Sequence, residues 1–90
     1  MRYRTYPEKI FYAACNGDLE ALRRHYDNGG AAGVRITRCG AVHSPIAGAV
    51  RNGQTAAVYY LISKGETSEQ HERAEIESYI KDIEQSRKGE

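Results

Sequence analysis

Hydrophobic residues in the first third of the chain follow the spacing of two short helices. Pro7 suits the first turn of a helix, because proline lacks the N–H that a first turn leaves unsatisfied. The apolar stripe that follows consists of Ile10, Phe11, Ala13 and Ala14. Asn16-Gly17 then ends the helix, since both residues tolerate the left-handed conformation of a C-cap. Asp18 is a good N-cap for a second helix ending at Asn28-Gly29, so residues 8–30 are predicted to form a helix pair.

The same pattern returns within residues 44–66. Three landmarks recur at one offset of 36 residues: Ala13 with Ala49, Asn16-Gly17 with Asn52-Gly53, and Gly29 with Gly65. Ser44-Pro45 can start the first helix of this second unit, and Leu61 and Ile62 lie on the apolar face of its second helix. Three landmarks at one spacing indicate an internal repeat of one helix pair.

The segment 31–43 between the two units has a different pattern. Val34-Arg35-Ile36-Thr37 alternates apolar and polar residues at a period of two, and Gly33 and Gly40 flank it. This alternation is typical of extended chain bounded by turns. We therefore expect a short extended or hairpin finger between the two helix pairs.

A third element follows Gly65. Thr67 and Gln70 stand at the spacing of a capping box. Apolar residues then recur at i, i+3, i+4 and i+7, which predicts an amphipathic helix over about residues 68–86 that caps the stack as segment 67–86. These residues are Ile76, Tyr79, Ile80 and Ile83. Glu72, Glu75 and Glu77 are expected on the solvated face of this helix, with no hydrophobic pocket to raise a pKa.

The second unit resembles the ankyrin repeat, whose pattern is T-P-L-H-x-A-A-x-x-G. The matching stretch is Ser44-Pro45-Ile46-Ala47-Gly48-Ala49-Val50-Arg51-Asn52-Gly53, with Ala47 in place of the histidine. The first unit keeps Ala13-Ala14 and Gly17, has Lys9 and Phe11 in place of proline and histidine, and ends on the polar pair His25-Tyr26. The repeat length of 36 exceeds the family's ~33 residues, which implies a lengthened finger. The resemblance covers residues 8–66.

This resemblance implies a fold and a way of acting. The expected fold is all-α: a short ankyrin-like helical repeat stack with an extended finger and a C-terminal amphipathic helix, in a single domain over residues 1–90. At least ~3 repeats are normally needed for a continuous core, so the C-terminal helix completes the stack or the protein forms a homodimer. Ankyrin proteins are non-catalytic scaffolds that bind partners through their fingers and inner helices. Carried over residue by residue, this implicates Arg35, Arg38 and His43 in the finger, and Tyr12, Asn16, Arg51 and Asn52 on the inner helices.

Composition agrees with one small domain. The 90 residues weigh 10.1 kDa, and 40% of them are hydrophobic, which suits a globular chain. No apolar run approaches the ~18 residues of a membrane span, and the N-terminus has no apolar signal-peptide core. Cys15 and Cys39 are too few for a disulfide framework or a zinc site. We therefore expect a reduced cytoplasmic protein without membrane association.

Charge is distributed unevenly and leaves several partner classes open. Residues 1–65 contain nine basic and four acidic residues, whereas residues 66–90 contain four basic and eight acidic ones. The basic part favours a protein partner with an acidic surface. Nucleic acid is the alternative partner for this part, through a set of seven arginines: Arg2, Arg4, Arg23, Arg24, Arg35, Arg38 and Arg51. The pI of about 7.8 lies below the value above 9 that is typical of nucleic-acid-binding domains. A third alternative uses the acidic C-terminal helix as a mimic of a nucleic-acid backbone or as a contact for a basic partner.

Catalytic and cofactor chemistry has little support in the sequence. His25, His43 and His71 are far apart and do not stand at metal-ligand spacing from a cysteine or aspartate. The glycines of 29–33 lack the Lys-Ser/Thr that follows a phosphate loop. The chain is therefore expected to be a non-enzymatic interaction module without a cofactor or metal, acting as a small inhibitor or adaptor of a larger protein.

Overall fold

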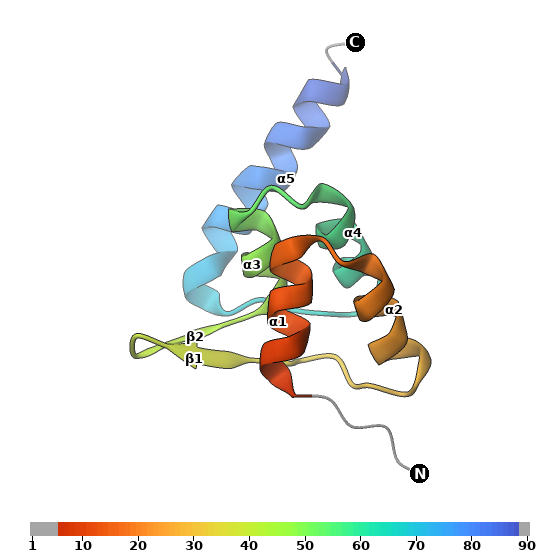
Figure 1. Cartoon of the computed structure of the whole chain (residues 1–90). Coiled ribbons are helices and arrows are strands. Elements are labelled where there is room, and N and C mark those ends of the chain that lie inside the picture. Colours follow the sequence, from red (N-terminus) through yellow and green to blue (C-terminus); the bar gives the residue numbers. More distant parts are fainter. Residues whose placement is uncertain (1–5, 89–90) are drawn as a thin grey trace.

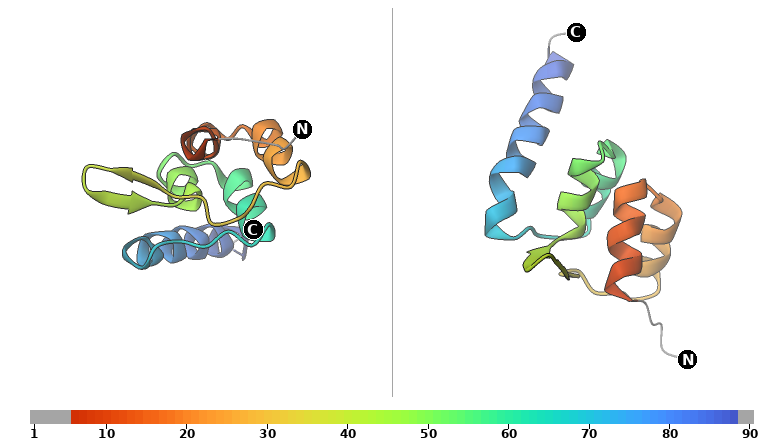
Figure 2. Two further views of the ribbon diagram at one scale, coloured as in Figure 1. Left: turned by 90° about the horizontal axis from the view of Figure 1, so that it is seen from below. Right: turned by 60° about the vertical axis from the view of Figure 1, so that its left-hand side comes forward.

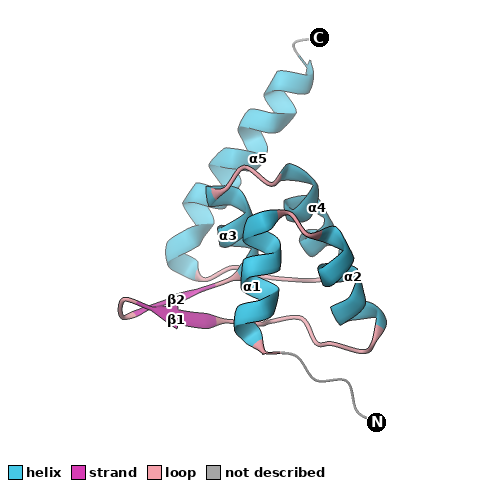
Figure 3. Ribbon diagram, in the orientation of Figure 1, coloured by secondary structure: helices cyan, strands magenta, loops and turns pink. Residues whose placement is uncertain are grey.

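The structure is a computed structural model that describes the backbone of residues 6–88 and the side chains of residues 6–86. It contains five α-helices, one short 3-10 helix and a two-stranded antiparallel hairpin (Figures 1 and 3). The expected all-α fold is confirmed in its coarser form: the described residues are mostly helical, with one small two-stranded sheet. Arg2 and Arg4 of the basic set lie outside the described residues. None of the described helices combines the length and the apolar character that crossing a membrane requires.

Two helix pairs repeat the same local geometry. The first pair consists of α1 (Pro7–Asn16) and α2 (Leu19–Asp27), and the second of α3 (Pro45–Arg51) and α4 (Thr55–Ser63). The glycines that join the helices of each pair, Gly17 and Gly53, both have φ 68°, a left-handed conformation that favours glycine. The backbone closes each turn in the same way: Asp18 N donates to Ala13 O at 2.8 Å, and Gln54 N donates to Ala49 O at 2.9 Å.

The helices pack in three layers. Figure 2 shows α1 and α2 in the first layer, α3 and α4 in the second, and the long helix α5 (Arg73–Lys88) in the third. Helix α1 packs against α3, α2 packs against α4, and α5 packs mainly against α3. The core lies between these layers and includes Ala14, Leu22, Ile46, Ala47, Val58, Leu61 and Ile76.

Helices α1 and α3 approach each other closely at Gly48. A Cβ atom at this position would lie 2.7 Å from Cys15 Sγ and 3.1 Å from Phe11 Cε1. The small residues of α3, Ala47, Gly48 and Ala49, are buried and let the two helices come together here. Cys15 is thus a packing residue, and burial raises the pKa of its thiol despite the opposing charges of Arg38 and Arg51.

The finger is a β-hairpin of β1 (Ile36–Arg38) and β2 (Ala41–His43). Its register pairs Ile36 with His43 and Arg38 with Ala41. Cys39 (φ 52°) and Gly40 (φ 78°) form the two-residue turn, and positive φ at both positions matches the right-handed twist of a tight hairpin. Ile36 is buried at the base of the finger, so the hairpin is anchored on the helical body and projects from it (Figure 1).

The C-terminal helix begins later than the sequence pattern predicts. A 3-10 turn (Gln70–Glu72) precedes α5, and the capping box is made by Glu69 and Glu72 rather than by Thr67 and Gln70. The prediction of a helix from residue 68 with a Thr67 cap was therefore wrong. The physical reason is a long-range contact: Thr67 Oγ1 accepts a hydrogen bond from Arg35 Nη2 at 2.9 Å, which keeps the residues before 70 extended along the finger base.

The close packing at Gly48 predicts a coupled stability effect. We expect Gly48→Ala to destabilise the protein by about 1–3 kcal/mol, because overpacking exceeds alanine's gain in helix propensity. Combining it with Cys15→Ala removes the nearest clash, so the two changes should be coupled favourably by about 0.5 kcal/mol or more in a double-mutant cycle. Urea unfolding of the four variants measures this coupling, and strictly additive effects would contradict it.

Candidate binding surface

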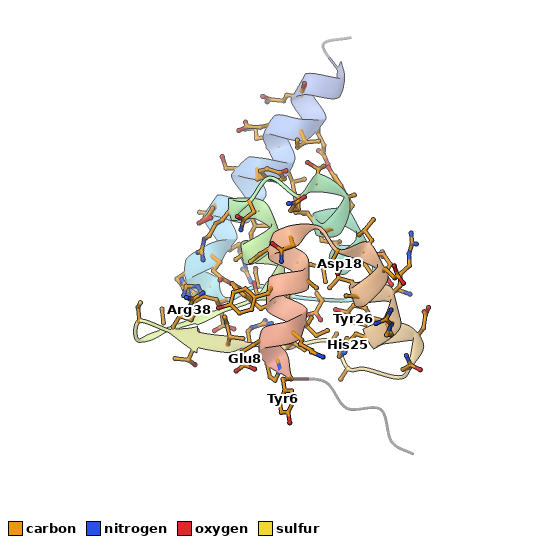
Figure 4. The ribbon with its side chains drawn as sticks, viewed as in Figure 1. Tyr6, Glu8, Asp18, His25, Tyr26 and Arg38 are labelled. Carbon is orange, nitrogen blue, oxygen red and sulfur yellow. The ribbon has the colours of Figure 1, made fainter. Side chains whose placement is uncertain are left out.

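Tyr12 and Arg38 join the finger to the first helix. The Arg38 guanidinium lies over the Tyr12 ring, with its Cζ 5.6 Å from the ring centroid, and reaches toward α1 (Figure 4). Tyr12 is 42% exposed, although its neighbour Phe11 is buried and packs edge-on against it at 5.5 Å. Helical periodicity explains this difference, since one residue further along α1 rotates the side chain by about 100°. The pair therefore presents a cation on a rigid aromatic support to solvent.

Arg35 is engaged within the protein. Its Nε donates to Glu69 Oε2 at 2.8 Å, and its Nη1 donates to its neighbour's carbonyl, Val34 O, at 2.9 Å. With the Thr67 bond described above, all three guanidinium nitrogens have a partner, and only 21% of the side chain is exposed. Arg35 therefore fixes the finger base to the segment before α5 and contributes little free surface.

His43 and Arg51 form a second group that is tied to α5. Arg51 Nε pairs with Glu75 Oε1 at 3.0 Å, and Arg51 Nη1 donates to His43 Nδ1 at 3.1 Å. The Phe11 and His43 rings lie 6.4 Å apart, so this group stands next to the Tyr12–Arg38 pair.

The two asparagines lie at helix ends. Asn52 is the C-cap residue of α3, and its Nδ2 donates to Gly48 O at 2.8 Å. Asn16 is the exposed last residue of α1. The seven sequence-predicted residues thus divide into several groups. Tyr12 and Arg38 are displayed together, and Arg51 lies beside them, paired with Glu75 and hydrogen-bonded to His43. Arg35 and Asn52 serve the fold, and no hydrogen bond or ion pair within residues 6–86 joins Asn16 to the other six.

The sequence analysis missed the buried carboxylate of Glu72. This side chain is 0% exposed, so its assignment to a solvated helix face was wrong. Its oxygens accept hydrogen bonds from Ser44 Oγ at 2.8 Å, Ser44 N at 3.2 Å and Glu69 N at 3.0 Å. His43 Nδ1 lies 3.5 Å from Glu72 Oε2. The spacing of Glu69 and Glu72 is a capping-box signal that could have indicated an engaged carboxylate.

Hydrogen bonding determines the charge state of Glu72. Burial by itself raises the pKa of this carboxyl, but the donors on Ser44 and Glu69, together with the charge of Arg51, outweigh burial and hold the pKa below its usual value. Ser44 Oγ also accepts from Ala47 N at 3.3 Å, so the same hydroxyl caps α3 and binds Glu72. The carboxylate is therefore a charged structural anchor.

A second buried carboxylate, Glu66, joins the loops at the opposite side of the stack. Its oxygens accept from the Tyr26 hydroxyl and from Gly33 N, the latter at 2.9 Å. Burial and this carboxylate raise the pKa of Tyr26 well above its ordinary value. Glu66 thus connects α2, the start of the finger segment and the end of the second helix pair, a role that no local sequence pattern indicates.

The opposite charges of the two chain regions meet in the fold. Arg35 pairs with Glu69, and Arg51 pairs with Glu75, so the acidic segment neutralises part of the predicted basic strip. No ion pair within residues 6–86 includes Arg38. The displayed positive charge of the finger is therefore concentrated at Arg38.

The described residues do not assemble a metal centre: no group of three or more His, Cys, Asp or Glu side chains in residues 6–86 could hold an ion. His25 is buried, and its Nε2 lies 3.1 Å from Ala31 O. Comparison of the chain with protein-family models, curated proteins and solved structures finds no match.

The burial of Glu72 predicts a large loss of stability on its removal. Glu72→Ala leaves the Ser44 N–H and hydroxyl without their acceptor, so we expect a loss of about 2–4 kcal/mol in the free energy of unfolding. The control is Glu77→Ala, an exposed acid of the adjoining helix α5, which should change the free energy of unfolding by less than about 0.5 kcal/mol. Urea unfolding at neutral pH compares the two; equal effects would refute the anchoring role.

The lowered pKa of Glu72 predicts acid sensitivity. Because the folded-state pKa lies below the unfolded one, the stabilisation is complete above the unfolded value of about 4.3 and is lost as pH falls through the folded value. The advantage of the wild type over Glu72→Gln should therefore shrink as pH decreases below about 4.3. Unfolding free energies measured between about pH 7 and pH 3 test this, and a constant difference would contradict it.

Proposed function

We propose that this chain is an ankyrin-type repeat module that binds a protein partner and has no catalytic activity. Support comes from two helix pairs joined by the same glycine turn, with α2 and α4 both nine residues long and starting at Leu19 and Thr55, 36 residues apart. Gly29 and Gly65 end the two pairs with φ 86° and 84°. A hairpin follows the first pair and α5 follows the second, so α5 takes the position of a capping element.

The observation that carries the binding proposal is the Arg38–Tyr12 pair. A guanidinium held over an aromatic ring keeps its N–H groups directed outward and loses little conformational entropy when it binds a ligand. It is suited to a carboxylate on an acidic surface of the partner. Tyr12 adds an amphipathic contact of the kind enriched at binding hot spots. Val42, 37% exposed on β2, adds apolar surface on the finger.

We propose that the module acts by occupying or bridging a larger protein, as an inhibitor or adaptor. A surface made of a hairpin and one helix can fill a site on a partner without bringing chemistry of its own. The reducing cytoplasm is the compartment in which we place this activity, since Cys15 and Cys39 are both free thiols.

This proposal predicts a charge-dependent loss of partner binding. Tagged wild type and Arg38→Glu are used to capture partners from source-cell lysate. We expect Arg38→Glu to reduce recovery of the specific protein at least about tenfold, because it places an acid against an acidic surface. The matched control is Arg23→Glu, the same change at an exposed position on α2, which should retain the partner. Tyr12→Ala should weaken binding in the same direction.

Parallel nuclease treatment separates the alternatives. A partner that survives nuclease and is lost only with Arg38→Glu supports the proposal. Recovery that disappears with nuclease would replace it with nucleic-acid binding, whose affinity should fall steeply with salt. A partner that both arginine variants retain would move the contact to the acidic C-terminal helix. In that helix region Glu69 and Glu75 already pair with Arg35 and Arg51, so Glu77 is the better position for charge reversal.

A further inference from the structure

One ring nitrogen of His43 faces two groups of opposite charge. Its Nδ1 lies 3.1 Å from Arg51 Nη1 and 3.5 Å from Glu72 Oε2. A guanidinium can only donate a hydrogen bond, and an ionised carboxylate can only accept one. Nδ1 therefore bonds to Arg51 when it carries a lone pair and to Glu72 when it carries a proton, so the two bonds exclude each other.

Glu72 has an acceptor position left for such a proton. Its Oε1 accepts from Ser44 Oγ at 2.8 Å and from Glu69 N at 3.0 Å, whereas its Oε2 accepts from Ser44 N at 3.2 Å. Each carboxylate oxygen offers two lone pairs, so Oε2, the atom nearest to His43, can take one further donor. Because Glu72 is fully buried, a charge on His43 interacts with it more strongly than it would in water.

Charged and titratable groups surround His43 on several elements. On the hairpin, Arg38 shares its face, because the register opposes Arg38 to Ala41 and directly opposed residues lie on one side of a sheet. The other groups are Glu8, Tyr12 and Cys15 of α1, Arg51 of α3, His71 and Glu72 of the 3-10 turn, and Glu75 of α5. A proton on His43 is therefore attracted by Glu72 and repelled by Arg51, and also by His71 when that ring is charged.

His43 can change its charge while the finger stays anchored. Its side chain is 18% exposed, so solvent reaches the ring. Histidine is the side chain whose charge changes between about pH 5 and about pH 8. His71 Nε2 lies 2.8 Å from Val42 O, which can only accept, so His71 donates this bond in its neutral and in its charged form. The contact that holds β2 is thus kept when His43 exchanges its partner.

We propose that His43 is a proton switch, which exchanges the Arg51 bond of its Nδ1 for a bond to Glu72 as the pH falls. Before the exchange, Arg51 Nη1 is occupied by His43. After it, Nη1 is released, and His43 is a cation on the face that carries Arg38. The finger then presents more positive charge to an acidic surface, so partner binding strengthens at lower pH. This last step rests on the function proposed above, whereas the switch itself is a property of the isolated chain.

Nitrogen NMR of the full chain between about pH 8 and about pH 5.5 tests the switch, because histidine changes charge in this range. His43→Gln assigns the His43 signals. We expect Nδ1 to be unprotonated at the alkaline end and protonated at the acidic end, and the Nε signal of Arg51 to move with the same midpoint. Arg35 is the matched control. Its Nε also binds a glutamate, but its other nitrogens bond to a carbonyl and a hydroxyl, so its signal should stay constant.

Three results would overturn the switch. The first is an Nδ1 of His43 that is already protonated at the alkaline end. The second is an Arg51 signal that does not follow the His43 titration, or follows it in His43→Gln and not in His71→Gln. The third comes from Arg51→Met, which removes the opposing charge and the donor. This variant should raise the midpoint of the His43 titration by roughly 0.5 pH units or more, and an unchanged midpoint contradicts the proposal.

The consequence for binding is measured with an acidic probe, a peptide of about six aspartates, which stays ionised throughout this range. Its affinity for the wild type should rise at least about threefold from the alkaline to the acidic end. His43→Gln should remove this dependence, and His71→Gln should keep it, since glutamine can still donate to Val42 O. A wild type whose binding does not change with pH overturns the regulatory step. Arg38→Glu separates the two proposals: if it leaves probe binding unchanged, the proposed binding function fails, while the NMR titration still decides the switch.

Discussion

The buried carboxylate of Glu72 is the interaction on which the rest of the structure depends. It binds the hydroxyl and the backbone N–H of Ser44, the N-cap residue of α3, and the backbone N–H of Glu69, which precedes α5. One side chain therefore fixes where the second helix pair starts and where the C-terminal helix docks. A charge can be buried here because its donors are preorganised by the helix cap and the capping box, which compensates for the loss of hydration.

The binding surface follows from this anchor. His43, the last residue of the finger, lies next to Glu72. His71, which precedes Glu72 in the sequence, has its Nε2 2.8 Å from the carbonyl oxygen of Val42. Arg35 holds the finger base from the same side. The hairpin is thus held by the segment that leads into α5, and its free side presents Arg38 to α1. The C-terminal element therefore caps the stack and also orients the finger.

The two ends of the helix stack differ in the chemistry of their outer helices. On the α1–α2 side, α2 carries charged residues at exposed positions such as Glu20 and Arg23, as a terminal layer should. On the other side, α5 covers α3 while Ile62 of α4 stays partly exposed. The difference between the two ends is chemical rather than geometric, since α2 and α4 have the same length and the same turns.

The sequence by itself determined the local structure: the two helix pairs, the glycine turns with positive φ, and the extended finger. These follow from side-chain periodicity and backbone preference over a few residues, which is why Asn16-Gly17 and Asn52-Gly53 marked helix ends correctly. Only the tertiary structure decided that Glu72 is buried, that Arg35 and Arg51 are held in ion pairs, and that α5 starts at Arg73. Those outcomes depend on pairs 24 to 34 residues apart, such as Arg51 with Glu75 and Arg35 with Glu69, and no periodicity within one helix reports such a pair.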